Sequence, residues 1–233
     1  MVTRHFAKFL INADKPMHGI NMIARAIRVL RSSNEQVSSL NTQYALLCLN
    51  ARCFQHSLAV IEHPITSVMS GTNPLEICTY NYYRGMLYMG LERYADAIEC
   101  YRKVLSQPAA MTHQVHMDAW QRISLLNLIV HGEAFNAKVA GVGAVVHRQI
   151  EMEENRRVQQ EGLQSIQDGS WMEEVGAAGG SLFESPNKWH GDLINAWETN
   201  SPTQMEEAIA GNLEALESER MLGMAQLMLQ SLI

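Results

Sequence analysis

Three histidines in this 233-residue chain are of a type that could bind a metal ion. His113 and His116 stand three positions apart in a segment expected to be helical, and His131 follows further along. A metal site needs three or four converging ligands and usually a carboxylate that orients a histidine. No H-E-x-x-H motif or Cys/His cluster completes such a set in the sequence. We therefore expect surface or helix-capping histidines, no bound metal and no cofactor.

Motifs for nucleotide binding and for nucleophilic catalysis are weak in this sequence. Gly141-Val-Gly143 lacks the third glycine of a dinucleotide-binding loop and follows no predicted strand. The G-x-x-x-x-G-K motif of phosphate-binding loops does not occur, and nothing resembles a nucleophile elbow. The sequence therefore predicts no catalytic residue and no small-molecule substrate.

The charge balance argues against a nucleic-acid partner. Lys and Arg number 18 and Asp and Glu number 24, a net charge of −6, whereas proteins that follow phosphates usually present a basic face. A run of tyrosines could stack on bases: Tyr80, Tyr82, Tyr83 and Tyr88. Because no basic patch accompanies the run, we interpret these tyrosines as core and hairpin-packing residues.

The sequence gives no sign of a signal peptide or a membrane span. Arg4 and Lys8 occupy positions where a signal peptide would place its apolar stretch. The longest apolar runs, 125–130 and 139–146, fall well short of the ~18 residues that a span needs. Four cysteines lie in apolar helical pattern without a C-x-x-C pair, so we expect buried free thiols in a reducing compartment and no membrane partner.

Helical periodicity dominates the chain. Apolar residues recur at spacings of three and four, most clearly over 20–30, 40–51, 77–91 and 115–130. No window alternates with period two, and no hairpin signal of the Asn-Gly type occurs. The predicted fold class is all-α.

Residues 81–108 match the tetratricopeptide pattern of paired helices. The pattern places a glycine, an aromatic three residues on, an alanine twelve on and an aromatic sixteen on, and the chain supplies Gly85, Tyr88, Ala97 and Tyr101. We expect the two antiparallel helices to meet at Gly85 and Ala97, which have little side chain. Tyr88 and Tyr101 would fill the space beside that contact.

A weaker copy of this pattern lies 40 residues upstream. Phe54 corresponds to Tyr94, and both precede the second helix of their hairpins. The other corresponding positions have suitable sizes: Ala45, Cys48, Ser57 and Ile61. Two such copies predict a right-handed solenoid of TPR-like helical hairpins, with a simple helical bundle as the alternative.

Three regions follow from these patterns. Residues 1–135 are expected to form a helical-repeat arm, 136–188 a divergent or flexible insertion rich in glycine, and 189–233 further helical repeats. The last helical segment has an apolar face, which must pack against another surface. Its expected partner surface comprises Met228, Leu229, Leu232 and Ile233.

Three stretches carry a resemblance to a known family: residues 15–27, 46–54 and the aromatic run at 80–91. They resemble the third-subunit family of the COP-9 signalosome, whose members have a PCI domain, a helical-repeat arm followed by a winged-helix module. The resemblance covers the helical arm, and we expect the chain to lack the family's first helices and to end before the winged helix. Residues 136–188 do not follow the family pattern.

The resemblance also implies a function. In that family the subunit is a non-catalytic scaffold of a complex that regulates cullin-RING ubiquitin ligases by removing a ubiquitin-like modifier from cullins. The isopeptidase motif belongs to a different subunit. The implied partners are other signalosome subunits, in the cytoplasm and nucleus. Two alternatives stay open: a related arm of a proteasome-lid or translation-initiation complex, and an enzyme with an unrecognised site.

Overall fold

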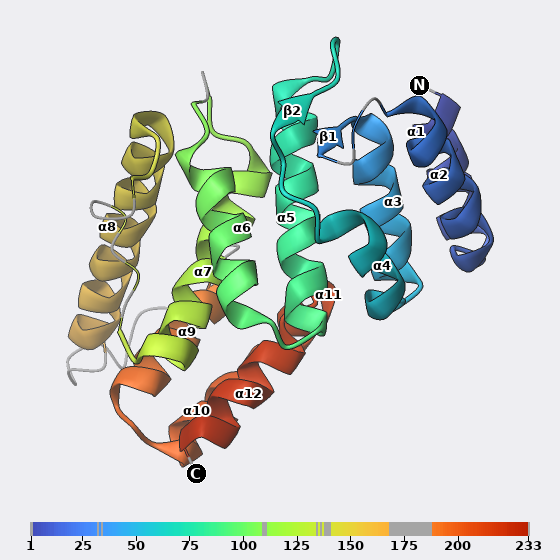
Figure 1. Ribbon diagram of the computed structural model, residues 1–233. Coiled ribbons are helices and arrows are strands. Elements are labelled where there is room, and N and C mark those ends of the chain that lie inside the picture. Colours follow the sequence, from blue (N-terminus) through green and yellow to red (C-terminus); the bar gives the residue numbers. More distant parts are fainter. Residues whose placement is uncertain are drawn as a thin grey trace. The chain divides into compact units, whose positions relative to one another are not determined.

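The computed structural model describes residues 2–31, 33, 35–108, 111–133, 135, 137, 141–167 and 188–232 (Figure 1). Within these ranges the chain forms twelve helices and two strands of two residues each. The predicted all-α class is therefore confirmed. The glycine-rich stretch within the expected insertion lies outside the described residues, and the preceding charged stretch is helical.

The chain divides into two compact units. The first comprises Met1–Leu126 with Asn136–Val146, and the second comprises Asn127–Phe135 with His147–Ile233. Two helices, α7 (Gln114–His131) and α8 (Ala144–Gln167), contribute residues to both. The expected boundaries at residues 135 and 188 stay predictions.

Three helical hairpins form the body of the first unit (Figure 1). They are α1 (Val2–Asn12) with α2 (Met17–Leu30), α3 (Ser39–Asn50) with α4 (Phe54–Ile61), and α5 (Pro74–Gly90) with α6 (Tyr94–Ser106). Helix α3 packs against α1, α2, α4 and α5, and α5 packs against α6. The hairpins thus stack in sequence order, as a solenoid requires.

The turns of the second and third hairpins show the 40-residue repeat directly. Arg52 and Glu92, which are 40 residues apart, both adopt the left-handed conformation, with φ of 52° and 60°. The same backbone hydrogen bond closes each turn: Cys53 N–H donates to Cys48 O, and Arg93 N–H donates to Tyr88 O, both at 2.9 Å. These bonds satisfy helix carbonyls that would otherwise lack a donor.

Turns with a left-handed residue also occur outside the two hairpins that the repeat pattern identified. Asp14, Asn200 and Arg220 also have positive φ, and each lies between two helices. Lys15 N–H donates to Leu10 O at 2.9 Å, and Met221 N–H donates to Leu216 O at 2.7 Å. Because none of the five left-handed residues is glycine, composition gave no signal for these turns.

Local sequence explains where several helices begin. Asn73 caps α5 by accepting a hydrogen bond from Leu75 N–H at 2.9 Å, and Pro74 occupies the first helical turn. Ser201 and Pro202 play the same parts at α10. At α3, Ser38 and Asn41 form a reciprocal capping box.

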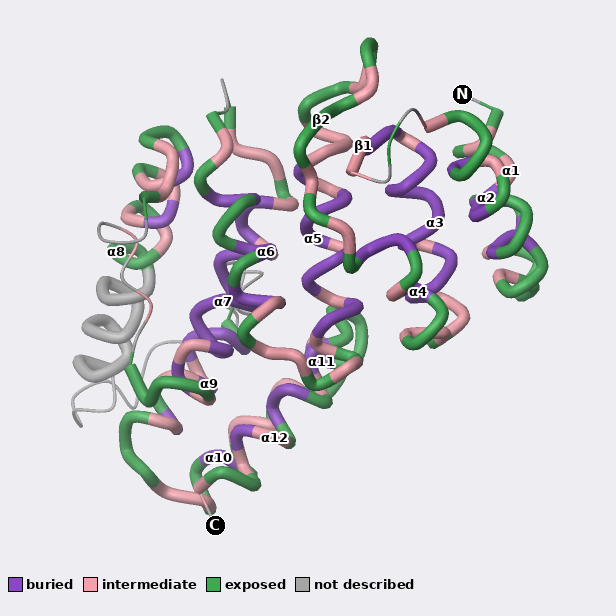
Figure 2. The backbone as a smooth tube through the Cα atoms, in the orientation of Figure 1, coloured by how far each residue is buried: buried purple, intermediate pink, exposed green. Residues whose placement is uncertain are grey.

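Helices α3 and α5 carry much of the first unit's core (Figure 2). On α3 the burial extends around the helix, so that polar residues such as Asn41 and Gln43 are buried beside Leu47 and Cys48. A helix enclosed on most sides has no polar stripe. The sequence pattern had placed the buried residues of this segment on a single face, whereas the buried residues of α3 extend around the helix.

A short parallel pairing links two loops of the first unit. Strand β1 (Gln36–Val37) pairs with β2 (Ser67–Val68), with Gln36 opposite Ser67. The two strands connect the loop between α2 and α3 with the loop between α4 and α5. Two residues are too few to show alternation, so the sequence predicted no strand.

The second unit contains four further helices. They are α9 (Lys188–Glu198), α10 (Pro202–Gly211), α11 (Leu213–Ser218) and α12 (Leu222–Leu232). Helix α10 packs against α9, α11 and α12. Trp189, Leu193, Met205 and Leu216 are buried in this unit. No helix among the described residues is long and apolar enough to cross a membrane.

Candidate interaction surfaces

The α5–α6 hairpin is closest at Gly85. A Cβ atom at that position would lie 2.6 Å from Cε1 of Tyr101, and its three nearest atoms all belong to that ring. Tyr101 and Ala97 are both fully buried. The glycine therefore accommodates the ring of Tyr101 on α6, which the sequence had placed beside the expected contact of Gly85 with Ala97, and that contact itself stays a prediction.

Tyr88 joins the third hairpin to the second. Its hydroxyl donates to Ile61 O at 3.0 Å and accepts from the Arg84 guanidinium at 3.3 Å. Arg84 also donates to His63 O at 3.3 Å. Tyr88 is 3% exposed, so its hydroxyl satisfies buried backbone as well as filling space.

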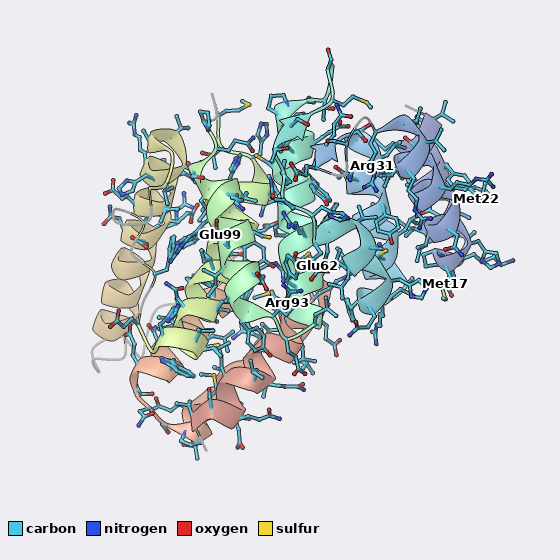
Figure 3. The ribbon with its side chains drawn as sticks, viewed as in Figure 1. Met17, Met22, Arg31, Glu62, Arg93 and Glu99 are labelled. Atoms are coloured by element: carbon cyan, nitrogen blue, oxygen red, sulfur yellow. The ribbon has the colours of Figure 1, made fainter. Side chains whose placement is uncertain are left out.

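A charged cluster surrounds this joint at the surface. The Arg93 guanidinium lies 4.9 Å from the centroid of the Tyr88 ring. It contacts Asp96 at 2.7 Å. It also contacts Glu62 at 3.1 Å, and the Arg93 and Glu62 side chains are both labelled in Figure 3. Since Glu62 follows α4 and Arg93 precedes α6, this cluster connects two hairpins that are distant in sequence.

Phe54 occupies the same position in the second hairpin that Tyr94 occupies in the third. A Cβ atom at Gly90 would lie 2.6 Å from Cε1 of Phe54, so the ring packs against the end of α5. A cavity of ≈ 420 Å³ opens beside this contact, lined by residues of both turns, including Arg52 and Glu92. Phe54 and Tyr94 are both half-buried.

Three of the four tyrosines in the run are buried, and Tyr83 is half-buried. Tyr80, Tyr82 and Tyr88 are all at most 8% exposed, and burial raises the pKa of Tyr80 to about 12. The Tyr82 hydroxyl accepts a hydrogen bond from Arg122 Nε at 2.9 Å, and Arg122 is itself buried. This arrangement supports hairpin packing over base stacking. Nothing in the residue pattern indicated that Arg84 and Arg122 would be buried.

His116 is a buried residue at the start of α7. Its Nδ1 accepts a hydrogen bond from His113 N–H at 3.1 Å, and its Nε2 lies 3.8 Å from the Cys78 sulfur. Burial lowers the pKa of His116. His116 therefore caps the start of α7, which is one of the two roles, surface or helix-capping, that the sequence predicted for these histidines. Across the described ranges, His, Cys, Asp and Glu side chains nowhere gather in a metal-binding group of three.

All four cysteines are free thiols. Cys48, Cys78 and Cys100 are buried, and burial raises their pKa values to about 12, 11 and 11. Cys53 is half-buried, so the expectation of burial holds for three of the four. Thiols with pKa values this high remain protonated at neutral pH and are poor nucleophiles.

The C-terminal stripe differs in one member from the expected partner surface. Met228 is fully buried, because α12 packs its Met224, Ala225 and Met228 side inward, and α12 contacts α9, α10 and α11. Met228 is therefore a core residue, which corrects its assignment to an accessible surface. Leu229 and Leu232 are half-buried, and Ile233 lies outside the described residues.

Comparison with known proteins identifies relatives of the first unit's helices. A family model described as COP9 signalosome complex subunit 3, N-terminal helical repeats, matches residues 1–139. The COP9 signalosome complex subunit 3 of Arabidopsis thaliana is 25% identical over 127 residues, which are 54% of this chain and 29% of that protein.

The subunit of the same name from Dictyostelium discoideum is 24% identical over 196 residues, which are 81% of this chain and 46% of that protein. The chain thus spans less than half the length of either relative. Both relatives are named as signalosome subunits. This favours the signalosome over the proteasome-lid and translation-initiation complexes that the sequence left open as alternatives.

Proposed function

The chain belongs to the family of the N-terminal helical repeats of COP9 signalosome complex subunit 3, and from this membership we propose that it is a non-catalytic scaffold subunit of the signalosome. The observation that carries the proposal is the family match over residues 1–139, which takes in all three hairpins of the first unit. The complex would act on cullin-RING ubiquitin ligases by removing a ubiquitin-like modifier from cullins.

The hairpin contacts support a scaffold because they are closely packed. Gly85, Gly90 and Gly19 each lie so close to a neighbouring side chain that a Cβ atom would meet it within 2.6 Å. Close-packed joints of this kind hold successive hairpins at fixed angles. A stack of hairpins then presents the same outer surface to every partner, which is what a subunit that positions others needs.

Partners and location follow from the same membership. We expect the other signalosome subunits to be its direct partners, with no small-molecule substrate, nucleic acid or membrane required. The expected location is that of the complex, in the cytoplasm and nucleus. The buried thiols, which form no disulfide, are compatible with these reducing compartments.

Affinity purification of the tagged chain from its native source, followed by quantitative mass spectrometry, tests this proposal. Signalosome subunits should be enriched with the chain at similar molar amounts. Recovery of proteasome-lid or initiation-complex subunits instead, or of a stable monomer alone, would contradict it. The purified chain by itself should cleave no modifier from a cullin conjugate, and cleavage by the chain alone would contradict the non-catalytic role.

A further inference from the structure

The first hairpin, α1 with α2, exposes an unusual amount of apolar side chain. Among the described residues, twelve large hydrophobic side chains are strongly exposed, and half of them lie in this hairpin: Val2, Phe9, Met17, Met22, Val29 and Leu30. The six are between 59% and 83% exposed. Single exposed hydrophobic residues are common, but a concentration of this kind marks an interaction surface.

The same hairpin has the opposite charge to the rest of the chain. Residues 1–31 contain six of the 18 Lys and Arg and one of the 24 Asp and Glu, a net charge of +5. The remaining residues contain 12 basic and 23 acidic side chains, a net charge of −11. The basic residues of the hairpin are Arg4, Lys8, Lys15, Arg25, Arg28 and Arg31.

On helix α2, exposed apolar side chains and positively charged side chains lie on the same face. Its inner side buries Ile20, Ile23 and Ile27, together with Gly19 and Ala24. The residues at the opposite side follow the helical spacing of four, three and four: His18, Met22, Arg25 and Val29. All four are exposed, and the exposed Met17 and Arg28 flank the row. Met17 and Met22 lie at the edge of the unit (Figure 3).

Charge on this face is not neutralised by described neighbours. No ion pair between described residues involves Arg25 or Arg28, and Asp14 is the only acidic residue among residues 1–31. By contrast, Arg93 and Lys103 of the third hairpin pair with Glu62, Asp96 and Glu99. The outer face of α2 therefore presents unpaired positive charge between flexible apolar side chains.

We infer that the outer face of α2 binds an acidic amphipathic helix of a partner subunit. Such a helix would place Asp or Glu against Arg25 and Arg28, and leucine- or methionine-type side chains against Met22 and Val29. Methionine suits this role because its unbranched side chain adapts to a partner's surface. The inference rests on the proposed function, since the partner belongs to the same assembly, and adds where that partner binds.

The arrangement favours a protein partner over a membrane or a nucleic acid. On α2 the cations are interspersed with the apolar residues, whereas a membrane-binding helix separates an apolar face from a charged one. The row also holds no Phe, Tyr or Trp side chain that could form a stacking platform for bases. Exposed Met22 and Val29 would gain nothing from contact with phosphates.

Binding of the full chain to a purified signalosome assembly that lacks subunit 3 tests the inference. We compare the wild type with Arg25→Glu/Arg28→Glu by biolayer interferometry, and use Arg102→Glu/Lys103→Glu on α6 as the matched control. Both variants change the charge by the same amount at exposed sites. The α2 variant should weaken binding at least tenfold, and the control should stay within twofold of the wild type.

A photo-crosslinker at position 22 identifies what covers the face, with position 68 in exposed β2 as the reference. The crosslinked peptide at position 22 should be rich in Asp and Glu with apolar residues at helical spacing. Equal binding by the α2 variant, or a crosslink to a basic segment, overturns the inference and leaves the proposed function standing. Failure of the wild type to bind at all overturns both.

Duplex DNA of 20 base pairs and phosphatidylserine vesicles serve as competing probes. Neither should bind the chain in a way that the Arg25→Glu/Arg28→Glu variant abolishes. If either does, the face is a nucleic-acid or membrane surface and the inferred protein partner is wrong. The circular dichroism spectra of both variants should match the wild type, because none of the four substituted side chains is buried.

Discussion

Gly85 is a residue at which a single added methyl group should matter. An alanine there would place its Cβ 2.6 Å from the ring of Tyr101, which is fully buried. We expect Gly85→Ala to lower the free energy of unfolding by about 1–3 kcal/mol. Chemical denaturation followed by circular dichroism measures the change.

Gly223 provides the matched control. It also lies in a helix, α12, but an added Cβ would meet nothing within 4 Å. Gly223→Ala should therefore leave stability unchanged or raise it by about 0.5–1 kcal/mol, since alanine is the better helix former. If both substitutions behave alike, the close approach of α5 to Tyr101 is not a determinant of the hairpin.

His116 makes stability depend on pH. Burial lowers its pKa in the folded chain below the ordinary value of 6.5, so the unfolded chain takes up the proton first. The free energy of unfolding should therefore fall as the pH drops below about 6.5, and the fall should end once the pH is below the folded-state pKa. Urea titrations between pH 5 and 8 measure this.

The variant His116→Asn isolates this effect. Its amide oxygen can still accept the hydrogen bond from His113 N–H, but it does not titrate. The difference in stability between wild type and variant should shrink or reverse in sign toward acidic pH. A difference that is constant over the range would show that His116 does not couple folding to protonation.

Sequence identified these residues unevenly. Gly85 and Tyr101 could be found because their spacing matches a repeat, but the atom that the glycine approaches depends on side-chain packing between helices, which spacing does not specify. The burial of Arg84 and Arg122 could not be predicted, since arginine is almost always exposed. Nearby tyrosine hydroxyls and a backbone carbonyl accept hydrogen bonds from these guanidinium groups, and the fold brings those partners together.

At the scale of elements, the joint between the second and third hairpins depends on a buried hydroxyl. Tyr88→Phe removes the donor to Ile61 O and the acceptor for Arg84 while keeping the ring. Leaving these buried groups without partners should cost about 1–3 kcal/mol in unfolding free energy. Thermal and urea unfolding of the full chain measure the loss.

Glu62→Gln tests the same joint at its exposed rim. It weakens the ion pair with Arg93, whose side chain is 40% exposed and therefore screened by solvent, so the expected loss of stability is small. The two variants should therefore differ clearly. A larger loss for Glu62→Gln than for Tyr88→Phe would mean that surface charge, and not the buried hydroxyl, connects the hairpins.

The elements themselves were largely predictable. Helical periodicity marked the helices, and the 40-residue spacing marked two hairpins. The periodicity could not give the short parallel pairing of β1 with β2, because two residues show no period.

For the whole molecule, the C-terminal helix offers a test of partner binding. Leu229 and Leu232 are half-buried on α12, beside the buried Met228. Leu229→Glu/Leu232→Glu should abolish binding of partners at this surface and improve solubility with little loss of helical signal. Circular dichroism and binding to the purified assembly measure both. Unfolding of the double variant would mean that these leucines are ordinary core.

Met228→Glu is the contrasting variant. It introduces a charge at a fully buried position, so it should unfold the second unit whether or not a partner binds nearby. Stability of Met228→Glu comparable to that of Leu229→Glu/Leu232→Glu would contradict the inward orientation of Met228.

Native mass spectrometry of the reconstituted assembly tests the central claim most directly. The chain, of 26.2 kDa, is mixed with the other signalosome subunits in the absence of subunit 3. If the chain is a scaffold subunit, the mass of the assembly should increase by the mass of one chain. The Arg102→Glu/Lys103→Glu variant, which serves as the control, should produce the same increase. An assembly whose mass is unchanged, with the folded chain detected only as a free monomer, would contradict the account.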